Sequence, residues 1–138
     1  MTTPAKIHHF GLVVPSIETY LQQSSMWELR SPIVEDPLQK ARLCMIGLVD
    51  DASPAIVELV QPLGDDSPTS RAASKGVGCH HVCLSVATAA AGDAMIAQHR
   101  LLPVTRWKPA ALFSGRPVRF VYSRNRELIE LISDDTGC

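Results

Sequence analysis

The chain has 138 residues, 46% of them hydrophobic and 20% charged, with a formal net charge of −1 at pH 7. These values are typical of one globular domain with an ordinary core. The near-neutral charge argues against general nucleic-acid binding, and no apolar run approaches the roughly 20 residues that cross a bilayer. The first residues lack the layout of a signal peptide, and the four cysteines show no C-x-x-C spacing. We therefore expect a cytoplasmic protein with reduced thiols and no membrane partner.

The first half of the chain predicts one strand, a short helix and three further strands. Residues 7–14 are apolar and β-branched; Pro15 ends this strand, and Ser16 is a suitable N-cap for a helix. The strand predicted after this helix is weak, because Pro32 cannot donate to a β-ladder. The three strands are expected at residues 27–34, 41–48 and 55–61.

The second half repeats this order after a short linking helix. Ser67 and Pro68 are suitable residues for the start of that helix, and Gly76 for its end. A strand at 79–86, an alanine-rich helix from about Thr88 to Arg100, weaker strands at 102–107 and 117–123, and a last strand at 127–133 complete the chain. We therefore predict an α+β fold in one domain, residues 1–138, built of two βαβββ modules at 5–63 and 77–133.

A short sequence occurs twice at one spacing. IHHFGLVV at 7–14 resembles CHHVCLSV at 79–86, and VELV at 57–60 resembles IELI at 129–132. His9 thus corresponds to His81 and Glu58 to Glu130, both 72 positions apart. Two matches at the same spacing indicate an internal duplication.

Strand alternation separates the histidines of each His-His pair. Side chains alternate across a strand, so His8 shares its face with the bulky Phe10, Leu12 and Val14. His9 instead shares a face with Gly11 and Val13, and His81 is placed in the same way by the second copy. We expect the bulky face to pack under helices and the other face to border a cavity. His9 and His81 are therefore the candidate ligands.

The two glutamates complete a candidate metal site. Glu58 and Glu130 lie between aliphatic residues, where an isolated carboxylate is costly to desolvate. Two imidazoles and two carboxylates that converge would bind a divalent ion with mixed nitrogen and oxygen ligands. The alternative is that the histidines hydrogen-bond locally and the glutamates are exposed. Four residues duplicated at one spacing favour the metal site, held by His9, Glu58, His81 and Glu130.

Basic residues dominate one stretch of the second half. Residues 94–126 contain no Asp or Glu but seven of the thirteen basic residues of the chain. These seven are Arg100, Arg106, Lys108, Arg116, Arg119, Arg124 and Arg126. They could line an anion site or form a solvated face, and the sequence leaves both readings open.

Over essentially its whole length the chain resembles the vicinal oxygen chelate superfamily, which includes glyoxalase I, methylmalonyl-CoA epimerases, extradiol dioxygenases and bleomycin-resistance proteins. The resemblance rests on IHHFGLVV (7–14), AIVELVQPLGDDSP (55–68), GCHHVCLSV (78–86) and ELIELIS (127–133), and the segment from Gln61 to Pro68 is most similar to the epimerase branch. It implies a cupped mixed sheet, a homodimer and one divalent ion (Co, Ni, Zn, Mn or Mg) at positions 9, 58, 81 and 130.

Two positions depart from the epimerase pattern. Epimerases of this branch usually carry glutamine at the second ligand position, where this chain has Glu58, as the glyoxalase I branch does. They also use a glutamate on the third strand as an acid/base group, and the corresponding residue here is Leu43. The usual pair of bases of that branch is therefore incomplete in this chain.

The resemblance implies a metal-dependent isomerase that removes a proton beside a carbonyl, with Glu130 as the first base and Glu58 as the second. We expect a small anionic substrate such as an acyl-CoA or a similar thioester. Candidate substrate contacts are Lys40, Arg42, Arg116 and Arg119. The alternatives are a glyoxalase I-type lactoylglutathione lyase, an Fe(II) extradiol-type dioxygenase using His9, His81 and Glu130, and a non-catalytic binding protein.

Overall fold

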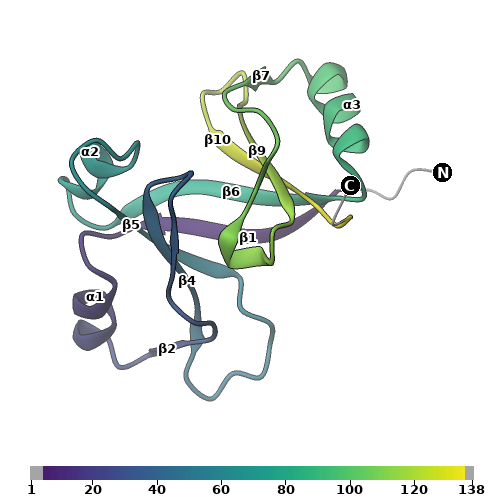
Figure 1. The fold of residues 1–138 in the computed structure, drawn as a ribbon. Helices are drawn as coiled ribbons and strands as arrows, with labels where there is room; N and C mark the ends of the chain where they lie inside the picture. Colours follow the sequence, from purple (N-terminus) through teal and green to yellow (C-terminus); the bar gives the residue numbers. More distant parts are fainter. Residues whose placement is uncertain (1–4, 136–138) are drawn as a thin grey trace. The chain divides into compact units, whose positions relative to one another are not determined.

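The computed structural model describes residues 5–135, which form two compact units. The first unit comprises residues 9–80, and the second comprises the rest of the described chain. The elements are β1 Lys6–Val13, α1 Ile17–Gln23, β2 Trp27–Leu29, β3 Val34–Asp36, β4 Ala41–Leu48, β5 Val57–Pro62, α2 Ser70–Ala73, β6 Gly78–Val86, α3 Ala89–His99, β7 Leu102–Pro103, β8 Lys108–Pro109, a 3₁₀ turn Ala111–Phe113, β9 Pro117–Tyr122 and β10 Leu128–Ser133. In each half a strand and a helix come first, as the sequence predicted, but four strands rather than the predicted three follow the helix (Figure 1). Residues 5–8, at the start of β1, group with the second unit.

In the first unit the strands run in the order β2-β4-β5-β1, and β3 pairs with another part of β4. β1 and β5 are parallel, whereas β4 is antiparallel to β2, β3 and β5. One face of this sheet carries α1. Its core consists of buried side chains from the end of β1, α1, β4 and β5: Val14, Ile17, Cys44, Ile46 and Leu59.

Helix α1 is fastened to the sheet through its first turn. The Ser16 hydroxyl accepts from the Thr19 amide at 3.2 Å, as the sequence predicted for an N-cap. The side-chain oxygen of Gln61 on β5 accepts from the Ile17 amide at 2.9 Å. Arg42 on β4 donates to both carboxylate oxygens of Glu18 at 2.8 Å. The helix therefore lies against β4 and β5 through polar contacts as well as through its apolar face.

In the second unit the strand order is β6-β10-β9-β7, and β8 pairs with β9. β10 is parallel to β6 and antiparallel to β9, so the sheet repeats the mixed pattern of the first unit. Helix α3 packs on one face of this sheet (Figure 1). Ile96 of α3 contacts Val121 and Leu131 there, and Leu84 and Met95 lie around them.

The ends and docking of α3 follow from single residues. Thr88 caps its first turn by accepting from the Ala91 amide at 3.0 Å, and Arg100 ends it in a left-handed conformation. A Cβ atom at Gly92 would lie only 2.7 Å from the Trp107 ring, so only glycine allows this close approach. The Trp107 indole also donates to Asp93 at 2.8 Å. The predicted helix from about Thr88 to Arg100 is confirmed.

Three sequence predictions about element boundaries were wrong. The strand predicted at 27–34 is two strands, because the Ser31 hydroxyl, rather than a backbone carbonyl, accepts from the Met45 amide. The strand predicted at 102–107 stops at Pro103, because the next two amides, of Val104 and Thr105, both donate to the Phe120 carbonyl. The linking helix begins later than predicted. The Ser67 hydroxyl accepts from the Thr69 amide at 3.4 Å, but α2 begins only at Ser70, with Thr69 at its N-cap.

The helices of this chain are short. The longest, α3, has 11 residues. Between residues 5 and 135 there is no helix with both the length and the apolar character needed to span a membrane.

The Glu18–Arg42 contact should give this fold a pH-dependent contribution to stability. Hydrogen bonds from Arg42 lower the pKa of Glu18 from 4.5 to about 2. Because the folded-state pKa is lower than that of the unfolded chain, the contribution is fully present above about pH 4.5 and is lost as the pH falls toward 2. We expect Glu18→Gln to be less stable than the unchanged protein at pH 6 by a modest amount, since the pair is exposed. The difference in urea midpoint should vanish near pH 2; a difference that stays constant with pH would contradict this.

Candidate metal centre

The first unit buries one histidine–glutamate pair. Glu58 on β5 lies opposite Gly11 of β1, and His9, two residues before Gly11, projects to the same face. The His9 side chain is fully buried, and Glu58 is 3% exposed. His9 Nε2 and Glu58 Oε1 are 3.6 Å apart. Gly11, which has no side chain, adds no bulk beside this pair.

The second unit buries a matching pair in the same register. Glu130 on β10 lies opposite Cys83 of β6, and His81 is two residues before Cys83. His81 Nε2 and Glu130 Oε1 are 3.3 Å apart, and both side chains are nearly inaccessible to solvent. The Phe120 ring meets the His81 ring edge-on, with centroids 5.6 Å apart. The duplication seen in the sequence therefore reproduces the geometry as well as the residue types.

The two separations are close to those between two ligands of one metal ion. N–H···O hydrogen bonds are usually about 2.7–3.2 Å long, so both distances exceed the common range. Two donor atoms that each lie about 2.1 Å from one ion are roughly 3.0–3.4 Å apart at tetrahedral or octahedral angles. An imidazole nitrogen and a carboxylate oxygen are also the ligands that many divalent transition metals take. The 3.3 Å pair of the second unit lies within this range, and the 3.6 Å pair of the first unit is slightly longer. Each pair therefore resembles half of a mixed-ligand metal site.

Apolar side chains surround both carboxylates. In the first unit Met45 lies opposite Glu58 across the β4–β5 ladder, and Leu43, 1% exposed, lies two residues away on the same face. In the second unit the buried Phe120 lies opposite Glu130. A carboxylate in such surroundings is stable only beside a cation or strong hydrogen-bond donors. Leu43 also means that β4 supplies no acid to this face.

The Cys44 thiol, next to Leu43 on β4, is not suited to metal binding. Burial, and in second place the negative charge of Glu58, raise its pKa to about 12. Cys44 packs instead in the core under α1, on the other face of the sheet. Because only the thiolate is a good metal ligand, Cys44 has a structural role.

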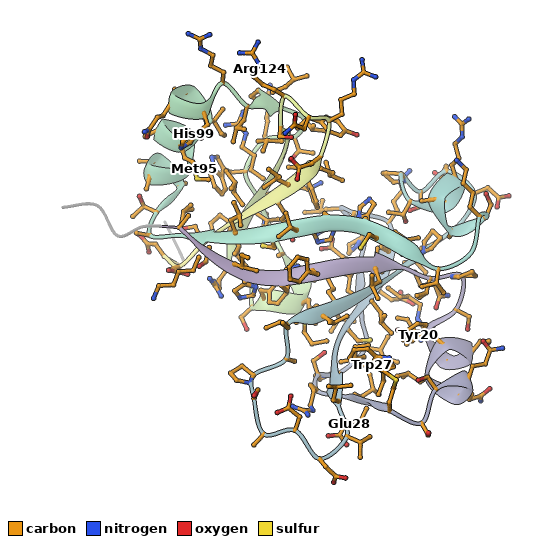
Figure 2. The ribbon with its side chains drawn as sticks, turned by 180° about the vertical axis from the view of Figure 1, so that it is seen from behind. Tyr20, Trp27, Glu28, Met95, His99 and Arg124 are labelled. Carbon is orange, nitrogen blue, oxygen red and sulfur yellow. The ribbon has the colours of Figure 1, made fainter. Side chains whose placement is uncertain are left out.

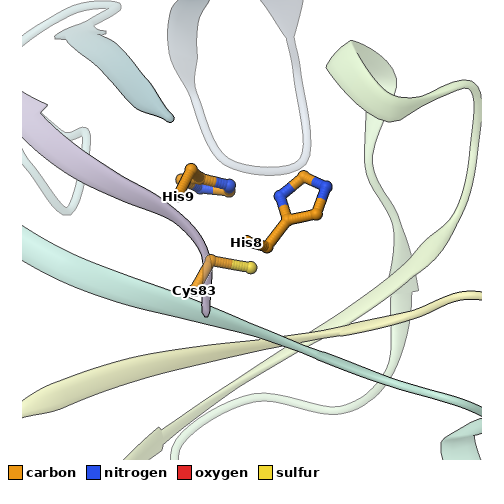
Figure 3. A group of neighbouring side chains, drawn as sticks. All are labelled: His8, His9 and Cys83. Atoms are coloured by element: carbon orange, nitrogen blue, oxygen red, sulfur yellow. The ribbon is translucent and has the colours of Figure 1, made fainter. Parts of the chain in front are cut away.

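The neighbouring histidines are placed differently. His8 and His80 are only partly buried, whereas His9 and His81 are buried. Figure 3 shows that His8 and His9 point in different directions from β1. His8 meets the Phe113 ring edge-on at 5.2 Å, and a nitrogen of its ring lies within 4.8 Å of the Cys83 sulfur. Alternation along the strand thus separates the two histidines as the sequence predicted.

The bulky faces of the two strands meet the helices, with one exception. Leu12 and Val14 pack against the α1 cluster, and Leu84 packs against the α3 cluster. Phe10 does not follow this pattern, since 39% of its surface is exposed.

The four basic residues predicted to contact substrate all have acidic neighbours. The distances are 2.6 Å for Lys40–Asp66, 2.8 Å for Arg42–Glu18, 2.8 Å for Arg116–Asp134 and 2.9 Å for Arg119–Asp93. Arg116 and Arg119 also donate to the backbone carbonyls of Ser133 and Thr105. These contacts hold loops and elements together, and a role of the four residues toward substrate stays a prediction.

Sequence reasoning missed Met45 and Phe120, the two residues opposite the glutamates. Each occupies an apolar strand, but nothing in the sequence states which residue of one strand lies opposite which residue of the next. These two neighbours become known only from the register of the β4–β5 and β9–β10 ladders in the structure.

Known protein families and solved structures resemble this chain. Residues 8–120 match the Glyoxalase/Bleomycin resistance protein/Dioxygenase superfamily. No curated protein sequence matches the chain significantly.

Similar solved structures include a hypothetical protein from Bacillus halodurans (22% identity, TM-score 0.77, covering 96% of both chains). A methylmalonyl-CoA epimerase from Mycobacterium tuberculosis has 16% identity and a TM-score of 0.75, covering 94% of this chain and 87% of its own. An epimerase variant from Streptomyces coelicolor, in complex with 2-nitronate-propionyl-CoA, has 21% identity and a TM-score of 0.74, covering 98% and 100%. At these identities the likeness establishes the α+β glyoxalase-like fold. With the family match over most of its length, the chain belongs to the Glyoxalase/Bleomycin resistance protein/Dioxygenase superfamily.

Proposed function

We propose that His9, Glu58, His81 and Glu130 together hold one divalent metal ion per chain. The support is that each unit buries one histidine–glutamate pair at a separation close to that of two ligands of one ion. Two carboxylates neutralise a 2+ charge, whereas one pair alone would leave a net positive charge in an apolar site. The equal spacing of the pairs along the chain supports a single shared ion.

We propose that the site removes a proton beside a carbonyl group. A bound ion would supply Lewis-acid stabilisation of the negative charge that develops on the carbonyl oxygen. Glu130 accepts the proton from the carbon atom at its carboxylate oxygen, and Glu58 carries the second proton transfer. Met45 and Leu43 beside Glu58, and Phe120 beside Glu130, keep water away from the carboxylates. None of these three apolar residues can exchange a proton, so the glutamates carry out both proton transfers.

The substrate class that we propose is an acyl-CoA or a similar anionic thioester, with an epimerase-like reaction. The observation that carries the reaction type is the pair of buried glutamates in equivalent registers. The similarity to methylmalonyl-CoA epimerase structures supports the thioester. A glyoxalase I-type lyase is the second candidate. That branch carries glutamate at the second ligand position, as Glu58 does here, and with Leu43 the strand β4 supplies no acid. An extradiol-type dioxygenase would need only three ligands, and Glu58 would be a fourth.

Among the histidines, metal binding should depend on His9 and His81. We expect the purified protein, after reconstitution and removal of free metal, to hold one divalent ion per chain. His9→Ala and His81→Ala should each lose most of it, because each removes one ligand. Chelation should lower the unfolding temperature of the unchanged protein, since the ion stabilises only the folded state. Elemental analysis and thermal unfolding measure both effects.

His8→Ala and His80→Ala are the matched controls, and both should keep the metal. Two ions per chain would contradict the shared site. Full metal content in both His9→Ala and His81→Ala would remove the proposal altogether.

Replacing Glu130 should impair proton transfer more than it impairs substrate binding. Glu130→Gln keeps an oxygen for the ion but cannot accept a proton, so kcat should fall by about 10²–10⁴-fold. kcat/KM should fall by a similar factor, the pattern of an interaction needed only in the transition state. Solvent-deuterium exchange into acyl-CoA and hemithioacetal substrates measures this. No exchange into either class would leave the reaction without support.

The variant Leu43→Glu distinguishes the candidate reactions, because it places an acid on the face of β4 that bears Leu43 and Met45, beside Glu58. A gain in methylmalonyl-CoA epimerisation would favour the epimerase reading. Lactoylglutathione formation by the unchanged protein would favour the lyase instead, and oxygen consumption with Fe(II) and a catechol would favour the dioxygenase.

We also propose a homodimer, from the resemblance and from the short strands β2 and β7 at the ends of their sheets. Light scattering at micromolar concentration should then give a mass near twice that of one 15.0 kDa chain. A mass of one chain would count against the dimer.

A further inference from the structure

Three arginines of the second unit gather at one end of its sheet. Arg100 follows α3, while Arg124 and Arg126 lie in the turn between β9 and β10. Leu102 pairs with Tyr122, so the chain just before Leu102 and the chain just after Tyr122 reach the same end of the sheet. Figure 2 shows Arg124 and His99 toward the same end of this unit. All three arginines are exposed, and within residues 5–135 none of them forms an ion pair with a carboxylate. We call Arg100, Arg124 and Arg126 the arginine cluster.

An apolar strip connects this cluster to Glu130. Phe120 lies opposite Glu130 on β10, and two residues further along Tyr122 lies opposite Leu128. Because strand side chains alternate, these residues share the Glu130 face, whereas Val121 and Leu131 face α3. Leu102 lies opposite Tyr122 on β7, and these two side chains are 65% and 40% exposed. Apolar side chains on this face thus continue from the buried Phe120 beside Glu130 to the exposed Tyr122 and Leu102, toward the arginine cluster.

We propose that this strip binds the carrier part of an acyl thioester, with its apolar spacer along Tyr122 and Leu102 and its phosphate groups at the arginine cluster. Guanidinium groups bind phosphate through two parallel hydrogen bonds, and three of them favour a ligand with several negative charges. The acidic side chain of this turn, Glu127, accepts from the Ser123 hydroxyl at 3.0 Å. The inference rests on the proposed function for the position of the acyl group, and it selects the substrate class.

The charges at the end of the strip distinguish the candidate substrates. Arg126 is four residues from Glu130, which corresponds to at most about 13 Å at roughly 3.3 Å per residue. Three arginines at that end favour a ligand whose multiply charged group lies away from the reacting carbon atom. A coenzyme A thioester has phosphates beyond a long spacer, whereas a glutathione hemithioacetal carries only carboxylates on a shorter body. The strip therefore favours coenzyme A thioesters.

Calorimetric titration with coenzyme A, pantetheine and ADP tests the proposal. The double variant Arg124→Ala/Arg126→Ala should bind coenzyme A about tenfold more weakly or worse, because removing a charge-assisted hydrogen bond typically weakens binding by about that factor. Its affinity for pantetheine, which lacks the phosphates, should not change. Tyr122→Ala should weaken the binding of both ligands. Raising the salt concentration should weaken coenzyme A binding to the unchanged protein more than to the double variant.

The control is Arg71→Ala/Lys75→Ala, which removes two exposed basic residues of the first unit and should bind coenzyme A normally. Equal affinity of the two double variants, or no binding of coenzyme A to the unchanged protein, would overturn the proposal. ADP binding as tight as that of coenzyme A would overturn the role of the strip. Metal content should be measured in every variant. A protein that binds coenzyme A at the arginine cluster but holds no metal would overturn the proposed function and leave the carrier site standing.

Discussion

The cost of burying a carboxylate is the constraint on which this structure depends. Glu58 and Glu130 occupy the middle of strands whose other residues form the core, and neither is more than 3% exposed. Hydrophobic burial of Leu59 and Leu131, the next residues along the two strands, stabilises the fold but also carries the glutamates out of water. A nearby imidazole is the partner that each unit provides. Core formation and site formation are thus the same event in each unit.

The duplicated register explains how two distant parts of the sequence build equivalent half-sites. In each unit a parallel strand pair sets a glutamate opposite a small residue, Gly11 or Cys83, and the histidine lies two residues earlier. Parallel pairing needs a crossover connection, which here contains a helix and the outer strands of the module. A substitution that shifted the register by one residue would turn the glutamate to the opposite face.

Charge is used in two ways in the second unit. Arg116 and Arg119 are partly covered and bind Asp134 and Asp93, so they connect β9 to the end of β10 and to α3. The arginine cluster has no such carboxylate partners within residues 5–135 and lies beside exposed apolar side chains. The first kind of arginine contributes to the fold, whereas the second kind is available to a ligand. A basic stretch in a sequence therefore contains residues with different roles, and only the contacts of each residue separate them.

The sequence by itself determined the order of elements, the duplication and the buried members of each His-His pair. These follow from local rules: β-branched runs, the caps Ser16 and Thr88, and alternation along one strand. Only the tertiary structure decided which residues of distant segments lie opposite each other. The Met45 and Phe120 walls, the split of residues 27–34 at Ser31, and the partners of Arg42 and Arg116 all depend on pairing between distant segments. Register and long-range ion pairs arise from packing of the whole unit, and no local pattern encodes them.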